Sequence, residues 1–320
     1  MITGLHHVTA ITGRPAENLA FYTAVLGLRL VKKTVNQDDV SAYHLFYGDE
    51  IGHPGTEITF FSWPDAPSNV PGAGTVAGIS LAVPGPEALQ WWRERLHRLG
   101  VPHGEVADRR GRAVLPFTDA EGQRLELVAA DPRPDVVPWA GSPVPGERAI
   151  RGMFGVTIDA AAPAPTVALL TRLFGFRQTD AYTEATGVAV TVLEAGPGGP
   201  GTEVRVVVPG PLRRGRPGIG GVHHVAFRTP DDAAHRGWQQ ALARAGVPAS
   251  PIIDRYYFRS IYFHEPGGTL FEIATDGPGF ATDEPVGSLG ERLALPPFLE
   301  PRRAEIEAGL TPLHTPAPQP

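Results

Sequence analysis

Short apolar stretches, each followed by a helical pattern, recur four times along the chain. The first stretch of each unit reads LHHVTAI, AGISLAV, MFGVTI and VHHVAFR. An amphipathic segment of about three helical turns follows, and then three strands that alternate apolar and polar residues or run apolar. This pattern predicts an α+β fold of four βαβββ modules, at residues 1–63, 76–131, 150–209 and 219–276.

The units also resemble one another in pairs. YTAVLGLR at 22–29 returns as LTRLFGFR at 170–177, and LHRLGVP at 96–102 returns as LARAGVP at 242–248. Unit one thus matches unit three, and unit two matches unit four, which predicts two halves related by a pseudo-twofold axis. The halves are 1–131 and 150–276, joined by a proline-rich linker at 132–149. A C-terminal extension, 277–320, is expected to form one short helix near 301–310 and to fray at TPAPQP.

Composition narrows the function classes. The chain has 320 residues, of which 42% are hydrophobic, so a large core is expected. It lacks cysteine, which excludes thiolate nucleophiles, zinc–cysteine sites and iron–sulfur clusters. The formal net charge is −6, without the excess of basic residues typical of nucleic-acid-binding proteins, so nucleic acid is not expected as a partner. No apolar run suits a membrane span and the first ten residues do not read as a signal peptide, so a cytoplasmic location is expected. A homo-oligomer is left open.

Two pairs of adjacent histidines occupy the first strands of units one and four. They are His6-His7 and His223-His224. Successive residues of a strand face opposite sides, so one histidine of each pair should point at a given centre. Imidazole is a common ligand of first-row metals. The pairs therefore predict a metal site to which two units contribute.

The repeat selects the ligands. Its alignment defines two equivalent sites, and one of them combines two histidines with a carboxylate: His7, His224 and Glu272. The other combines two glycines with a carboxylate: Gly155, Gly78 and Glu126. Thr59 takes the place in unit one that Glu272 has in unit four, and it is a poor ligand. Two histidines and one carboxylate with open positions form the facial triad of non-haem Fe(II) oxygenases.

A structural interpretation competes with the metal site. Lone histidines in strands are usually structural, and Glu126 shows that a glutamate can occupy this position without a metal. Against it, both histidine pairs fall at the same place in the repeat and a carboxylate falls on the matching last strand. His44 and His53 are interpreted as turn or pocket-rim groups, and the basic segment 212–218 as a solvated loop.

Five stretches, in this order, carry a family resemblance: LHHVTAI, FYTAVLGLRLVKKTVN, YHLFYGDEIGHPGT, VHHVAFRT and FHEPGGTLFEIATDGPGF. With the tail LPPFLEPRRAEIEAGL they resemble the hydroquinone-type ring-cleaving dioxygenases of the glyoxalase/bleomycin-resistance/extradiol dioxygenase (vicinal-oxygen-chelate) superfamily, over essentially the whole chain. The resemblance implies four βαβββ modules and an Fe(II) centre, with Mn(II) in a few relatives. It also implies O₂-dependent cleavage of a hydroquinone-type or catechol-type aromatic diol.

The resemblance also implies site residues. It places the metal ligands on His7, His224 and Glu272, which is the choice made from the repeat. It places further functional residues on Arg255, Tyr262, His6, Thr9 and His223. Tyr262 and His223 are candidates for proton transfer and Arg255 for stabilising oxyanion charge, whereas His6 and His223 can also orient the ligands.

Two alternatives share this fold. A glyoxalase-like metal-dependent isomerase or transferase usually presents a fourth protein ligand, which Thr59 does not supply. A non-catalytic binding protein of the bleomycin-resistance type needs no iron and leaves the histidine pairs unexplained. Fold alone does not separate these functions. Catechol-cleaving relatives build their site within one half, but Gly155 stands where that would need a histidine, which favours the hydroquinone branch.

Overall fold

The computed structural model describes residues 1–210 and 213–313, and it confirms the four βαβββ modules. Unit one contains β1 (Leu5–Thr12), α1 (Pro15–Ala20), β2 (Arg29–Asn36), β3 (Asp39–Gly48) and β4 (Glu57–Ser62). Unit two contains β5 (Thr75–Pro84), α2 (Gly85–Arg98), β6 (Ala107–Arg109), β7 (Arg112–Thr118) and β8 (Arg124–Ala130).

The C-terminal units repeat this order. Unit three contains β9 (Met153–Asp159), α3 (Pro163–Ala168), β10 (Arg177–Thr183), β11 (Ala189–Glu194) and β12 (Glu203–Val208). Unit four contains β13 (Gly221–Thr229), α4 (Asp232–Arg244), β14 (Ile253–Asp254), β15 (Arg259–His264) and β16 (Leu270–Thr275). The predicted helices of units one and three are only six residues long, and each continues into a π-helical turn, Phe21–Val25 and Leu169–Leu173. The shared irregularity is a further mark of the repeat.

The extension after unit four is mostly irregular. Its predicted helix is α5 (Arg303–Gly309), which packs outside β3. The segment TPAPQP, which was expected to fray, lies outside the described residues. Further back in the extension, Asp283 and Glu284 form ion pairs with Lys32, which is completely buried on β2. These ion pairs fasten the extension to unit one.

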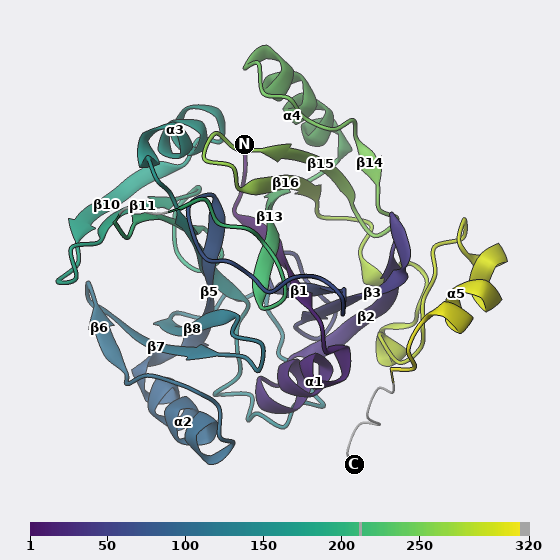
Figure 1. Ribbon diagram of the computed structural model, residues 1–320. Coiled ribbons are helices and arrows are strands. Elements are labelled where there is room, and N and C mark those ends of the chain that lie inside the picture. Colours follow the sequence, from purple (N-terminus) through teal and green to yellow (C-terminus); the bar gives the residue numbers. More distant parts are fainter. Residues whose placement is uncertain (211–212, 314–320) are drawn as a thin grey trace.

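In the described ranges, sixteen strands form two eight-stranded sheets. One has the order β14-β15-β16-β13-β1-β4-β3-β2 and the other the order β10-β11-β12-β9-β5-β8-β7-β6. Each sheet therefore joins one unit from each half of the sequence, units one and four in the first and units two and three in the second. Figure 1 shows β1 and β13 side by side in the middle of the molecule and α1 to α4 around the outside.

Strand registers reproduce the alignment of the repeat. In the first sheet His7 lies opposite Ala226, and Thr9 lies opposite His224. In the second sheet Gly155 lies opposite Ser80. On the neighbouring parallel strands, Ala226 pairs with Glu272 as Ser80 pairs with Glu126. The two sheets thus carry equivalent positions that differ in side-chain chemistry.

No described helix has the length and apolar character that crossing a membrane would require.

Candidate metal centre

His7, His224 and Glu272 converge from three neighbouring strands, β1, β13 and β16. His224 Nε2 lies 2.9 Å from Glu272 Oε2, and His7 Nε2 lies 3.3 Å from the same oxygen. The two Nε2 atoms are 3.4 Å apart. All three residues are at most 3% exposed. Three potential ligand atoms thus meet at one buried point, although the two histidines are 217 positions apart in the sequence.

The first histidine of each pair fixes the ring of the second. His6 Nδ1 lies 2.9 Å from His7 Nδ1, and His223 Nδ1 lies 2.8 Å from His224 Nδ1. With their Nδ1 atoms engaged, His7 and His224 both present Nε2 to the centre. The His6 ring is held from behind, because its Nε2 donates to the backbone carbonyl of Thr275 at 3.0 Å.

The protonation states of the group suit metal ligation. Burial by itself would raise the pKa of Glu272, but His7 and His224 outweigh it and hold the pKa well below its usual value. Burial lowers the pKa of His224 more than Glu272 raises it. The carboxylate is therefore ionised and the imidazole of His224 keeps a free lone pair, as binding of a cation requires.

The spacing of the donors also fits a metal ion. First-row divalent ions bond nitrogen and oxygen at about 2.1 Å, so donors at right angles lie about 3.0 Å apart. The observed separations of 2.9, 3.3 and 3.4 Å agree with three donors on one face of such an ion. Glu272 Oε2 is buried and accepts no well-aligned hydrogen bond from the protein, although Ser260 Oγ donates to Oε1. A cation would satisfy this oxygen.

Arginine fills the equivalent position in the other sheet. Arg205 occupies the register position in the second sheet that Thr59 occupies in the first. Its guanidinium lies 2.5 Å from the carboxylate of Glu126. Arg109 adds a second, two-pronged contact at 2.6 and 2.8 Å. Burial would raise the pKa of Glu126, but these arginines lower it. Glu126 is neutralised by protein cations, so this position has no need of a metal.

The glycine at the place of His7 could not be replaced there. A Cβ atom on Gly155 would lie 2.6 Å from the carbonyl oxygen of Glu203 and 2.8 Å from its Cβ. Backbone on the adjacent strand therefore excludes any side chain at this position. The second sheet cannot regain the two-histidine arrangement by substitution alone.

A narrow cavity opens on His7 and His224. Its wall is partly aromatic, from Phe46, Phe61, Tyr257, Phe258 and Tyr262. Its polar wall comes from units one and four: His7, Thr34, Asn36, Gln37, His44, His224 and Arg255. A small aromatic ring with polar substituents matches this lining.

Tyr262 and Arg255 both border this cavity. The Tyr262 ring lies 5.6 Å from the ring of His224, and the Arg255 guanidinium lies 5.4 Å over the Tyr262 ring. Burial, and then the charge of Glu272, raises the pKa of Tyr262, so its hydroxyl stays protonated as a hydrogen-bond donor. Arg255 is oriented by Asp38, whose carboxylate accepts from it at 2.7 and 3.1 Å.

Three other predicted site residues lie outside the cavity. His6 supports His7 from behind, and His223 lines a different cavity, where burial and then His224 lower its pKa to about 3. Thr9 Oγ1 lies 2.8 Å from Thr59 Oγ1. Of the two candidates for proton transfer, only Tyr262 borders the cavity next to the three converging residues.

His44 is part of the cavity wall rather than a turn. It lies on β3 between the rings of Phe46 and Phe61, at 3.9 and 4.4 Å. Its Nε2 is 3.0 Å from Thr59 Oγ1. Burial, and then His7 and His224, hold its pKa well below its usual value, so the ring is neutral. Strand alternation in AYHLFYG, which places His44 and Phe46 on one face, is a signal that could have located it. His53 is a turn group, paired with Asp49 at 2.7 Å.

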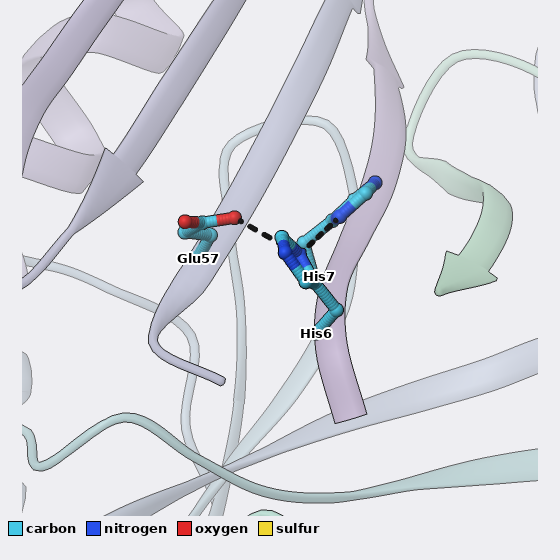
Figure 2. A group of neighbouring side chains, drawn as sticks. All are labelled: His6, His7 and Glu57. Atoms are coloured by element: carbon cyan, nitrogen blue, oxygen red, sulfur yellow. Dashed lines mark hydrogen bonds and ion pairs between the residues drawn. The ribbon is translucent and has the colours of Figure 1, made fainter. Parts of the chain in front are cut away.

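Glu57 is a buried carboxylate that the sequence reasoning did not single out. It is 1% exposed on β4, and its Oε2 lies 3.5 Å from His6 Nδ1, so that Glu57, His6 and His7 form a row (Figure 2). Among the described residues it has no arginine or lysine partner. Burial alone would lower the pKa of His6, but Glu57 and then Glu272 raise it. The repeated dipeptide Thr-Glu at 56–57 and 202–203 was the available signal.

The equivalent carboxylate in the other sheet has different partners. Glu203 stands at the place of Glu57 and pairs with Arg112 at 2.7 Å and Arg205 at 3.5 Å. It therefore resembles Glu126 in being neutralised by arginine. In the first sheet the imidazole of His6 faces the carboxylate of Glu57, with no arginine beside it in the described part of the chain.

Comparison with known proteins agrees with this architecture. The sequence profile of the Glyoxalase/Bleomycin resistance protein/Dioxygenase superfamily matches residues 4–127 and 158–273. The chain is 46% identical over 314 residues to the Bacillus subtilis (strain 168) protein named "Putative ring-cleaving dioxygenase MhqA", covering 98% of this chain and 99% of the relative. It is 31% identical over 317 residues to a Sphingobium indicum chlorohydroquinone/hydroquinone 1,2-dioxygenase, covering 95% of each.

A solved structure shows the same fold. The crystal structure of a Bacillus subtilis protein named "putative dioxygenase" superimposes with a TM-score of 0.91 at 41% identity, and the match covers 98% of both chains. The βαβββ repeat, the two sheets and these matches together define the class. The chain belongs to the Glyoxalase/Bleomycin resistance protein/Dioxygenase superfamily, as the sequence resemblance implied.

Proposed function

We propose that this chain is an iron(II)-dependent dioxygenase that cleaves the ring of a hydroquinone-type aromatic diol with O₂. The observation that carries the proposal is the meeting of His7, His224 and Glu272 at separations suited to one face of a metal ion. The names of the relatives support ring cleavage, and one of them acts on hydroquinones. Mn(II) is the alternative ion, and a cytoplasmic location stays a prediction from the sequence.

The donor set supports iron or manganese as the metal. Imidazole and carboxylate suit iron and manganese, and three protein ligands leave positions for substrate and O₂. A glyoxalase-like reaction would need a fourth ligand near Thr59, whose hydroxyl already contacts Thr9 and His44. A non-catalytic binding protein would not require a metal, so the burial of an ionised carboxylate beside two histidines would be unexplained. Both alternatives are therefore less well supported.

Bound iron would supply the redox chemistry between the diol and O₂. The chain's own residues bind and orient the ring and move protons. The aromatic wall holds the ring and excludes water, while the protonated hydroxyl of Tyr262 can donate to an oxygen of the substrate and so act as a general acid. The guanidinium of Arg255 next to it stabilises negative charge that develops on that oxygen.

A para-diol places particular demands on the cavity. It can offer only one of its two hydroxyls to a metal ion, so the other must be held by the protein. His44 is neutral and stands in the wall with its Nε2 contacting Thr59. It gives the cavity a polar group in addition to Tyr262 and Arg255. We assign His44 to recognition of the distal hydroxyl.

Substrate preference tests the proposal directly. Hydroquinone, or a chloro- or methyl-substituted hydroquinone, should be turned over with a higher kcat/KM than catechol. The measurement is O₂ consumption by the iron-loaded protein, with the ring-opened product identified by its mass. A preference for catechol, with cleavage next to its two hydroxyls, would reject the para-diol assignment and leave the metal site intact. Absence of O₂ uptake with every diol would reject the dioxygenase itself.

Glu57 should affect metal affinity without touching the metal. By facing His6 it keeps that ring where His6 Nδ1 meets His7 Nδ1, and such supporting contacts are typically worth 10–100-fold in affinity. We expect Glu57→Gln to weaken Mn(II) binding by about this factor, measured by titration of metal-free protein. Glu203→Gln, the same change at the equivalent place in the other sheet, should leave the affinity unchanged. Equal effects of the two variants would show that Glu57 acts only on folding.

A further inference from the structure

A second cavity of about 460 Å³ lies where the start of β13 meets β5 and the 214–217 segment. Val222 and His223 border it from β13, and Thr75 and Val76 border it from β5. His223 is the residue that contacts the metal-site histidine His224 through Nδ1. The cavity therefore adjoins the candidate metal centre but is lined by different residues.

The wall of this cavity is cationic. The positive charge comes from Arg214 and Arg216, and among the described residues no aspartate or glutamate lines the cavity. The chain as a whole has a formal net charge of −6, so this concentration of basic groups runs against its average. An anion entering the cavity would meet guanidinium groups without displacing a carboxylate.

The two arginines are not engaged elsewhere. Within the described part of the chain, neither guanidinium forms a hydrogen bond or ion pair, in contrast to Arg109, Arg205 and Arg255. The backbone nevertheless holds both in place, because Arg214 bridges to Ala73 and Arg216 to Val70. A Cβ on Gly268 would lie 3.6 Å from Arg214 Nη2, which places that guanidinium against the glycine turn beneath the cavity.

A buried hydroxyl without a partner lies beside this cavity. Thr269 lines it and is only 3% exposed, and its Oγ1 has no hydrogen-bond partner. Unsatisfied buried polar atoms are uncommon and call for a partner. The nearby carboxylate of Glu265 cannot neutralise the arginines, since it already accepts from Thr166 Oγ1 and the amides of Gly267 and Thr269.

We propose that this cavity is a binding site for a small oxyanion, a carboxylate or a phosphate. Guanidinium groups bind both oxyanions through paired, charge-assisted hydrogen bonds. Arg214 and Arg216 would supply these bonds. A bound anion would lie beside His223, one imidazole away from the candidate metal ligand His224.

Calorimetric titration of the metal-free, full-length protein tests the site independently of the proposed catalysis. The probes are inorganic phosphate and muconate, a six-carbon dicarboxylate, at low ionic strength because exposed charges are screened by salt. We expect saturable binding of one anion per chain. Loss of one charge-assisted contact should weaken it about tenfold or more, so Arg214→Gln and Arg216→Gln should each do so.

Arg213→Gln is the matched control, since Arg213 is exposed on the same segment but does not line the cavity. It should leave the affinity unchanged, and bound anion should shift the amide NMR signals of Gly268 and Thr269. Binding of phosphate alone would identify a phosphate site, and binding of muconate alone a carboxylate site. Absence of saturation with both probes, or an equal loss in Arg213→Gln, would overturn the proposal, whatever the enzyme does with diols.

Discussion

Glu272→Gln is expected to remove most of the iron from the protein and to abolish turnover. The substitution deletes the negative charge that lies 3.3 Å from His7 Nε2 and 2.9 Å from His224 Nε2, and it leaves a weak amide ligand in its place. Glu126→Gln makes the same change at the equivalent register position of the other sheet. There the carboxylate is held by Arg109 and Arg205, so this variant should keep full iron content and near-normal activity.

Elemental analysis of the purified variants, with circular dichroism as a check on folding, measures this effect. His7→Ala and His224→Ala should lose iron as Glu272→Gln does. Wild-type iron content in any of the three would remove that residue from the ligand set. Loss of iron in Glu126→Gln would mean instead that the second sheet contributes to the metal site.

Tyr262→Phe should lower kcat by about 10²–10⁴-fold, the usual cost of losing a general acid–base group, while iron remains bound. The substitution keeps the ring that packs 5.6 Å from His224 and removes only the hydroxyl. Because the raised pKa keeps that hydroxyl protonated at neutral pH, the loss is that of a proton donor.

Steady-state O₂ uptake at saturating hydroquinone, together with iron content, distinguishes this effect from loss of the metal. Tyr256→Phe serves as the control, since Tyr256 lies on the same segment but does not line the cavity. Its kcat should match that of the unmodified protein. If Tyr262→Phe also retained full kcat, proton donation would have to be reassigned to another group of the cavity wall.

Much of this architecture could be predicted from the sequence, because it is encoded locally. Alternation of period two and helical segments repeated four times define the βαβββ modules, and strand geometry dictates that one histidine of each adjacent pair faces a given centre. Alignment of the repeat units then matched glycines in one sheet to histidines in the other. It thereby distinguished a complete set of metal ligands from an incomplete one. These inferences need only the periodicity of the backbone and a comparison of the chain with itself.

Only the tertiary structure determined which side chains surround that centre. Pairing of β1 with β4 brings Glu57 to His6, and the sheet shared by units one and four places His44 in the wall of a common cavity, whereas His223 faces a separate cavity. The arginines that neutralise Glu126 come from strands in two different units. Such contacts depend on register between distant strands and on the rotamers that packing selects. A period-two pattern reports the face on which a residue lies but not the partner that it meets there.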